Sequence, residues 1–286
     1  RQVKRHRRSV LGQWTIRIVV AAMIVTGTYL VIENQTYTSV ATADSHKKDT
    51  EDSNQYIAFS DGVIRYSRDG VVFLNKRNKE KWIQPCQIQN PIVDVNEDVF
   101  AIADVGGNTI MIFQKSGLKG EIETTLPIEK ISVSNQGIVS AILKNESTPQ
   151  IISYDAVGNI LVEHQVNLNS TGYPISLDMS ADGENLMVSY LSTKNGTLKS
   201  MVAFYNFGKE GQEKTDNLIY TEDFEQTVVP DVFYMDASTS VAVGDKSFVI
   251  YEGTKSVKKK TEVKLNQEIR SEFHSDRYIG FILTNV

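Results

Sequence analysis

Residues Ile92–Thr125 read IVDVNEDVFAIADVGGNTIMIFQKSGLKGEIETT. Short runs rich in Val, Ile and Phe alternate here with turn residues, which is typical of β-strands joined by tight connections. The runs predict four strands, at Ile92–Val95, Val99–Ala103, Thr109–Phe113 and Glu121–Thr125. Glycines between the runs supply the positive φ that hairpin turns need. The stretch therefore predicts one four-stranded antiparallel unit.

Similar groups of strands precede and follow this unit. The predicted second strands begin 36, 39, 48, 55 and 37 residues apart, at Val63, Val99, Ile138, Leu186, Val241 and Tyr278. A period of about forty residues is that of a propeller blade. We attribute the two long spacings to polar insertions at residues 192–196, 208–216 and 222–230. A four-stranded unit cannot bury both faces alone, whereas stacking such units around an axis leaves only short edges.

We therefore expect residues 56–286 to form an all-β domain, a β-propeller of four-stranded blades with about five and a half blades present. A sandwich or meandering barrel would also give short strands and frequent turns, but neither predicts the grouping in fours. The chain begins without Met and ends just after a predicted strand, so we expect a fragment whose ring is closed by further residues. Tyr56–Ser60 is a candidate for completing the last blade.

The N-terminal region predicts a membrane anchor. Residues 14–32 are apolar apart from Arg17, and as a helix they would be roughly 28 Å long, close to the hydrocarbon thickness of a bilayer. We expect residues 1–13 to be a basic tail, 14–32 a transmembrane signal anchor in the lipid bilayer, and 33–55 a flexible linker. The anchor residues are Trp14, Arg17, Ile18, Val19, Val20, Ile24, Val25, Tyr29, Leu30, Val31 and Ile32.

Charge sets the expected orientation of this anchor. Five basic residues precede it, so the positive-inside rule places the N-terminus in the cytoplasm and the C-terminal domain outside the cell membrane. The alternative is a cleavable signal peptide, because Ala41-Thr42-Ala43 matches the small-residue pattern before a cleavage site. Cleavage after Ala43 would release the domain. The eleven residues between Ile32 and Ala43 form a long gap for a signal peptide and favour the uncleaved anchor.

Composition narrows the class of protein. From Ile18 onward there are 24 basic and 35 acidic residues, a net charge of −11, which argues against a nucleic-acid partner. Cys86 is the only cysteine, so no intramolecular disulfide can form and a thiolate zinc site lacks ligands. A domain held by packing alone favours a bacterial envelope protein.

The opening unit carries a resemblance. Asp61–Trp82, DGVIRYSRDGVVFLNKRNKEKW, looks like the first blade of quinoprotein-like and WD40-like propellers, with Trp82 closing the outer strand. Behind a basic signal anchor, the whole chain resembles an uncharacterised family of membrane-anchored bacterial propellers, the domain-of-unknown-function 5711 family. That family has no known catalytic residues to transfer. Quinoprotein dehydrogenases repeat a Trp motif, whereas Trp82 is the only Trp beyond the anchor, so we expect no cofactor.

The sequence has few residues in patterns that indicate catalysis or metal binding. His164 and His274 lie 110 residues apart, without the spacing of a metal motif. The acidic group Asp94, Glu97, Asp98 and Asp104 lacks the order of a calcium loop, and we interpret it as turn residues. A lysine cluster comprises Lys255, Lys258, Lys259, Lys260 and Lys264. It could bind anionic wall polymer or lipid headgroups, but we favour the interpretation that it is the solvated face of an outer strand.

These features favour a binding or scaffolding module over an enzyme, with no predicted catalytic, cofactor-binding or metal-binding residue. The hypothesis is a membrane-tethered extracytoplasmic propeller at the bacterial cell envelope, whose partner is an unknown envelope protein, peptide or glycan. One alternative is a polysaccharide hydrolase or lyase, which requires carboxylates from two blades within about 10 Å in the funnel. Another is the sensory ectodomain of a membrane complex.

Overall fold

The computed structural model describes residues 2–35, 54–194 and 196–284, and the chain divides into two units, Arg1–Asp52 and Ser53–Val286. In the first unit, helix α1 (Gln2–Glu33) includes a stretch, Gln13–Ile32, that is long and apolar enough to cross a membrane. Its mean hydropathy is 2.0 and none of it is buried. Most of the expected linker, and the proposed cleavage site at Ala43, lie outside the described residues.

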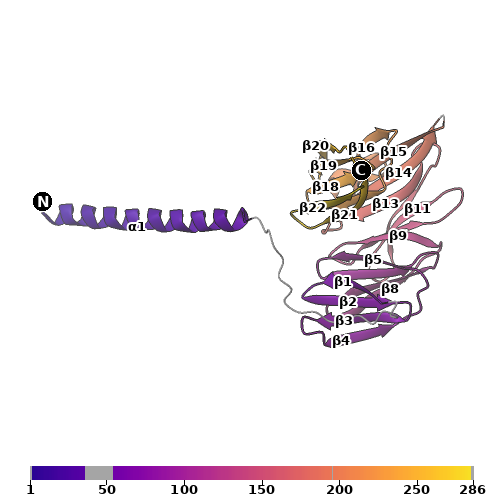
Figure 1. The fold of residues 1–286 in the computed structure, drawn as a ribbon, viewed down its shortest axis with the longest axis horizontal. Helices are drawn as coiled ribbons and strands as arrows, with labels where there is room; N and C mark the ends of the chain where they lie inside the picture. The colour runs from indigo at the N-terminus through magenta and orange to yellow at the C-terminus, as the bar shows by residue number, and fades with distance from the viewer. Residues whose placement is uncertain (1, 36–53, 195, 285–286) are drawn as a thin grey trace. The chain divides into compact units, whose positions relative to one another are not determined.

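The second unit is a series of antiparallel sheets in chain order (Figure 1). Blade 1 contains β1 (Gln55–Phe59), β2 (Gly62–Ser67), β3 (Gly70–Asn75) and β4 (Glu80–Pro85). Blade 2 contains β5 (Pro91–Asn96), β6 (Val99–Asp104), β7 (Thr109–Gln114) and β8 (Gly117–Glu123). Blade 3 contains β9 (Ile128–Val133), β10 (Val139–Leu143), β11 (Gln150–Tyr154) and β12 (Ile160–Gln165).

The C-terminal half continues the same arrangement. Blade 4 contains β13 (Tyr173–Met179), β14 (Asn185–Lys194), β15 (Thr197–Asn206) and β16 (Leu218–Glu225). Blade 5 contains β17 (Asp231–Tyr234), β18 (Thr239–Val243), β19 (Ser247–Glu252) and β20 (Lys258–Lys264). The final hairpin consists of β21 (Ile269–His274) and β22 (Ile279–Leu283). The predicted propeller of about five and a half four-stranded blades is therefore confirmed.

Two expectations about the first blades were wrong. β1 pairs with β2 in blade 1, with Tyr56 opposite Arg65, so Tyr56–Ser60 does not complete the last blade. The connection from Phe59 to Gly62 is too short to let β1 join another sheet. β8 begins at Gly117, four residues before the predicted strand, because Gly117 has a φ of 122° and turns the chain immediately after β7.

The spacing of 55 residues between Leu186 and Val241 has two causes. The expected insertion at residues 192–196 takes the form of a longer hairpin, because β14 and β15 have ten residues each and pair without a break from Asn185 opposite Asn206 to Lys194 opposite Thr197. Residues 208–216 are an insertion, since helix α2 (Lys209–Gln212) and the 3₁₀ turn η1 (Thr215–Asn217) lie between β15 and β16. At residues 222–230, β16 continues through Glu225 and only the remainder is a connection.

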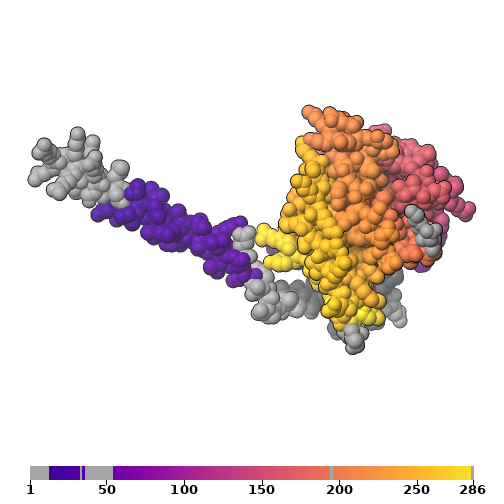
Figure 2. Space-filling view, turned by 90° about the horizontal axis from the view of Figure 1, so that it is seen from above, coloured from indigo at the N-terminus to yellow at the C-terminus, as the bar shows by residue number. Residues whose placement is uncertain are grey.

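The core lies between the blades. Five clusters of buried apolar side chains fill the spaces between successive sheets, from blade 1 to the final hairpin. Between blades 1 and 2, for example, the rings of Phe59 and Phe100 pack edge to face, with centroids 6.2 Å apart. The C-terminal strands, coloured orange and yellow, form one continuous packed surface (Figure 2). Blades 2 to 5 thus bury both faces against their neighbours, as in a propeller, whereas blade 1 and the final hairpin are each covered on one face.

A carboxylate-lined central funnel as candidate functional site

The first strands of successive blades surround a cavity. β5, β9, β13 and β17 contact one another in order, which places them along the axis of the propeller. Together with the end of β21 they line a cavity of about 830 Å³, the central funnel. The turns that follow these strands also contribute, so the funnel opens at the end where first strands connect to second strands.

The lining of the central funnel is predominantly acidic. Lys130 and His274 are the basic side chains of the wall. Six carboxylates face them, and these are Asp94, Glu97, Asp178, Asp231, Asp236 and Asp276. A cleft lined by one sign of charge concentrates its field and attracts ligands of the opposite sign.

Two of these carboxyl groups contact neighbouring residues of blade 3. Ser132 Oγ donates to Asp178 Oδ1 at 2.7 Å and accepts the backbone N–H of Met179 at 2.9 Å. Asp94 Oδ2 accepts the backbone N–H of Val133 at 2.6 Å. Blade 2 and blade 4 thus both contact the end of β9 in blade 3.

Burial raises the pKa of both carboxyl groups. For Asp94, backbone N–H groups of Val133 and Val95 oppose that effect without cancelling it. For Asp178, the nearby Asp94 charge raises the pKa further, although the N–H of Tyr234 donates to Asp178 Oδ2 at 2.6 Å. Like charges disfavour each other's ionisation, so the Asp94 charge opposes the ionisation of Asp178.

A second group of acidic side chains lies where blade 5 meets the final hairpin. Asp231 Oδ1 accepts the hydroxyl of Ser176 at 3.2 Å, and the Glu272 carboxyl lies near Asp231. Burial, and then the charge of Glu272, raise the pKa of Asp231. His274 Nδ1 lies 3.1 Å from Glu272 Oε2, and the imidazole stacks on Phe233 with ring centroids 3.7 Å apart.

The pKa of His274 is raised by neighbouring acidic groups. Partial burial lowers the pKa, but the hydrogen bond to Glu272 and the charges of Glu272, Asp178 and Asp231 raise it overall. His164 lies elsewhere, on the outer strand β12, where its ring packs 4.9 Å from that of Tyr205. Of the two histidines in the domain, only His274 belongs to the central funnel.

The interpretation of the acidic group as turn residues was wrong for Asp94, which lies within β5 and faces the next blade. Glu97 does lie in the turn between β5 and β6, where it accepts from Asn135 at 2.7 Å, whereas Asp104 is the last residue of β6 and accepts the N–H of Asn90 at 2.7 Å. Sequence reasoning missed Asp178 and Asp231 of the funnel wall, and it missed Ser132, which donates to Asp178. Each of the two aspartates lies on the first strand of a blade, so a comparison of the first strands would have brought them into view together with Asp94.

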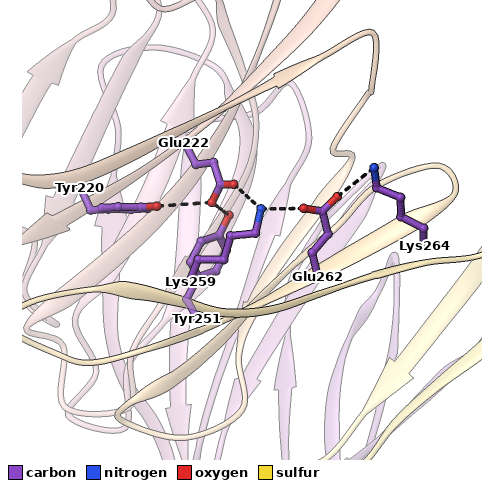
Figure 3. Close-up of polar contacts among 6 residues, drawn as sticks. All are labelled: Tyr220, Glu222, Tyr251, Lys259, Glu262 and Lys264. Atoms are coloured by element: carbon purple, nitrogen blue, oxygen red, sulfur yellow. Dashed lines mark hydrogen bonds and ion pairs between the residues drawn. The ribbon is translucent and has the colours of Figure 1, made fainter.

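The lysine cluster lies on the outer strand of blade 5. Lys259 Nζ donates to Glu222 Oε1 at 2.8 Å and to Glu262 Oε2 at 2.6 Å, and Lys264 lies 3.7 Å from Glu262 (Figure 3). Lys255 pairs with Glu210 at 2.5 Å, and Lys260 pairs with Glu252. Because carboxylates neutralise four of the five lysines, the cluster fits the edge-strand interpretation better than an anion-binding surface.

Comparisons with known proteins agree with the fold. A model for a family of unknown function (DUF5711) matches residues 33–286. The WD40 domain of Pan2 from Neurospora crassa is 13% identical, with a TM-score of 0.52 over 78% of this chain and 68% of that chain. Hydrazine synthase from Kuenenia stuttgartiensis is 14% identical, with a TM-score of 0.53 over 80% of this chain and 70% of that one.

A third similar structure is Hsv2 from Kluyveromyces lactis, which is 9% identical, with a TM-score of 0.50 over 74% of each chain. None of the curated proteins matches this sequence. At such low identities the similarity establishes the propeller fold alone, and the role of the central funnel has to be argued from its own residues.

Proposed function

The chain belongs to the DUF5711 family of unknown function, and we propose that it is a membrane-tethered extracytoplasmic propeller that binds a partner at the bacterial cell envelope. The partner is an envelope protein, peptide or glycan. A helix able to cross a membrane precedes a propeller, and this arrangement supports a binding module held at a membrane surface.

The proposed anchor is residues 14–32, with the N-terminus in the cytoplasm. The basic residues before the apolar stretch support this orientation through the positive-inside bias. Trp14 suits the interface, and Arg17 can extend toward the headgroups while its stem stays in the apolar region. The Arg17 guanidinium lies 5.8 Å from the centroid of the Trp14 ring, a contact that would keep both side chains near one boundary.

The central funnel is the proposed binding site. The observation that carries this proposal is a cavity of about 830 Å³ to which four blades and the final hairpin all contribute. Pockets of this size occur where ligands bind, and convergent polar groups supply specificity. The excess of carboxylates favours a ligand with exposed amino or guanidinium groups over an anionic polymer.

Charge reversal at the funnel mouth tests this proposal. The full chain in nanodiscs is titrated with a lysine peptide, a glutamate peptide and a neutral amino-sugar oligosaccharide. We expect the lysine peptide to bind more tightly than the glutamate peptide. Asp236→Lys and Asp276→Lys should weaken its binding about tenfold, because both carboxylates line the funnel.

The matched control is Glu146→Lys, which makes the same charge change in the exposed turn between β10 and β11, at the opposite end of the blades. It should leave affinity within about twofold of the parent. Preference for the glutamate peptide, or equal weakening by all three substitutions, would contradict a funnel site. Tight binding of the oligosaccharide that is lost only in the funnel variants would identify a glycan ligand instead.

A second candidate function is hydrolysis or cleavage of an envelope polysaccharide. It requires two carboxyl groups from different blades, and Asp94 of blade 2 and Asp178 of blade 4 both line the central funnel. Both carboxyl groups are, however, bonded to backbone N–H groups of neighbouring blades, which suits a structural link better than an acid and a nucleophile. Release of reducing ends from purified wall glycan that is abolished by Asp94→Asn would favour the enzyme.

A further inference from the structure

A second cavity, the interblade pocket, adjoins the central funnel. It has a volume of about 310 Å³ and lies between blades 3 and 4. The turn between β13 and β14 contributes to both cavities, since Ala181 lines the funnel whereas Asp182 and Gly183 line the interblade pocket. Consecutive Cα atoms are only about 3.8 Å apart, so the two cavities meet at this turn.

Hydrogen bonds hold the wall between the two cavities in place. The N–H of Asn135, in the turn between β9 and β10, donates to the carbonyl oxygen of Ala181 at 3.0 Å. Gln136 Nε2 of the same turn donates to the carbonyl oxygen of Asp182 at 3.0 Å. The Asn135 side chain also donates to Glu97, a residue of the funnel wall, at 2.7 Å. These contacts connect blades 2, 3 and 4 and set the position of the interblade pocket relative to the funnel.

The interblade pocket combines apolar walls with negative charge. Apolar side chains of blade 3 and of the residue that follows β15 form the walls, and these are Ile138, Leu161, Val162 and Phe207. Leu161 is 49% exposed, so one apolar wall is accessible to a ligand. Asp182 and Glu184 carry the charges, and among the residues that the structure describes no basic side chain lines this pocket.

The apolar surface continues outside the interblade pocket. Val157, in the turn between β11 and β12, is 75% exposed, and Ile160, at the start of β12, is 54% exposed. Together with Leu161 they place three exposed aliphatic side chains within one short segment of blade 3. Clustered apolar side chains in contact with water are typical of binding surfaces.

These features distinguish between the ligand classes that the charge of the funnel leaves open. The hydroxyl groups of a glycan would find no hydrogen-bonding partner on aliphatic walls, and burying them unpaired is unfavourable. An apolar side chain gains free energy when the same walls remove it from water. The acidic funnel favours an amino or guanidinium group. A peptide can carry both kinds of side chain on one short chain.

We propose that the ligand of the central funnel is a peptide segment that places a basic side chain in the funnel and an apolar side chain, a few residues away, in the interblade pocket. This inference rests on the proposed binding role of the funnel and narrows its ligand to a peptide. The carboxylates of both cavities disfavour an acidic segment. An extended peptide spans roughly 3.3 Å per residue, so the spacing between the two side chains reports the separation of the two cavities.

Fluorescent peptides titrated against the full chain in nanodiscs test the proposal. Each peptide carries two lysines, a glycine spacer of varied length and a terminal leucine or alanine. At the best spacer length we expect leucine to bind about tenfold more tightly than alanine, as burial of an aliphatic side chain predicts. Leu161→Asp should reduce this ratio to about twofold or less, because it places a charge against the docked leucine.

Leu198→Asp is the matched control. Leu198 is 47% exposed in the β14–β15 hairpin and lines neither cavity, so the variant should keep the full ratio of leucine to alanine affinity. Asp236→Lys, in the funnel, should weaken both peptides alike and also keep the ratio. A leucine gain that survives Leu161→Asp, or that Leu198→Asp abolishes equally, would overturn the assignment of the interblade pocket.

The same titrations separate this proposal from the funnel site itself. Equal affinity of the leucine and alanine peptides at every spacer length, with both weakened by Asp236→Lys, would overturn the apolar subsite and leave the funnel as a binding site. Affinities that Asp236→Lys does not change would contradict the funnel site instead. Tighter binding of the neutral amino-sugar oligosaccharide than of every peptide would overturn the assignment of a peptide ligand.

Discussion

Individual side chains in this protein act mainly between sheets. Trp82 shows the pattern at the outer strands, because its indole ring stacks on Phe113 of the next blade, with centroids 5.1 Å apart and planes 7° from parallel. Its Nε1–H also donates to the carbonyl oxygen of Lys115 at 3.0 Å. Asp94 and Asp178 show the same pattern at the funnel, where a carboxyl group of one blade accepts a backbone N–H of another.

Replacement of Trp82 tests the outer contact. Trp82→Ala removes the ring stack and the hydrogen bond, and we expect a loss of about 3 kcal/mol in the free energy of unfolding. Trp82→Phe keeps an aromatic ring beside Phe113 and loses only the donor, so it should cost about 1 kcal/mol. Chemical denaturation measures both. Equal losses for the two variants would show that the stack contributes nothing.

Gly120 marks a close approach between blades 2 and 3. A Cβ atom at this position would lie 1.7 Å from the carbonyl oxygen of Ala156, so any side chain forces the two backbones apart. We expect Gly120→Ala to destabilise the protein by about 2 kcal/mol. Glu121→Ala, at the exposed neighbouring position of β8, is the control and should change stability by less than about 0.5 kcal/mol. A tolerated Gly120→Ala would contradict the packing of these two blades.

Strands can be predicted from the sequence where each one has its own run of apolar residues bounded by turn residues. The alternating apolar runs and glycine turns predict the four strands of blade 2, and only β8 begins at a different residue. The polar residues at 192–196 predict an insertion, but not that it lengthens a hairpin. The funnel was missed for a different reason. Asp94 and Asp178 are 84 positions apart and meet only through the propeller, so no local spacing identifies them.

The interface between the outer strands of blades 4 and 5 depends on Glu222 (Figure 3). This carboxylate accepts the hydroxyl of Tyr251 at 2.8 Å, lies 3.5 Å from the hydroxyl of Tyr220, and pairs with Lys259 at 2.8 Å. Its side chain is only 17% exposed, so these contacts are shielded from water. Burial, and then the contact with Glu222, raise the pKa of Tyr251, so that the phenol remains the donor.

Glu222→Gln removes the charge from this interface and leaves the shape nearly unchanged. We expect a loss of about 2 kcal/mol, because the Lys259 ammonium loses a partially buried counter-ion. Glu225→Gln on the same strand is the control, since the Glu225 side chain is 70% exposed and pairs with Lys199 at the surface. It should cost less than about 0.5 kcal/mol. Denaturation midpoints that shift equally would contradict a special role for Glu222.

At the scale of the whole molecule, a helix that can cross a membrane precedes a propeller with an acidic funnel. The two parts explain different aspects of the proposed function. The helix would set the location, and the funnel would select the partner by charge. Length, composition and the blade period predict the helix and the propeller from the sequence, but they do not predict the acidic funnel. The basic residues on the N-terminal side of the helix set its expected orientation in the membrane. The extracytoplasmic role of the propeller depends on this orientation.

Site-directed labelling in intact cells tests the orientation of the helix directly. In a Cys86→Ser background, Glu146→Cys places a thiol in an exposed turn of the propeller and Ser9→Cys places one before the apolar stretch. Both are treated with a membrane-impermeant maleimide before and after lysis. We predict that the propeller thiol is labelled in intact cells and remains with the membrane fraction, whereas the tail thiol is labelled only after lysis. The reverse pattern, or a propeller found free in the medium, would contradict a tethered extracytoplasmic module.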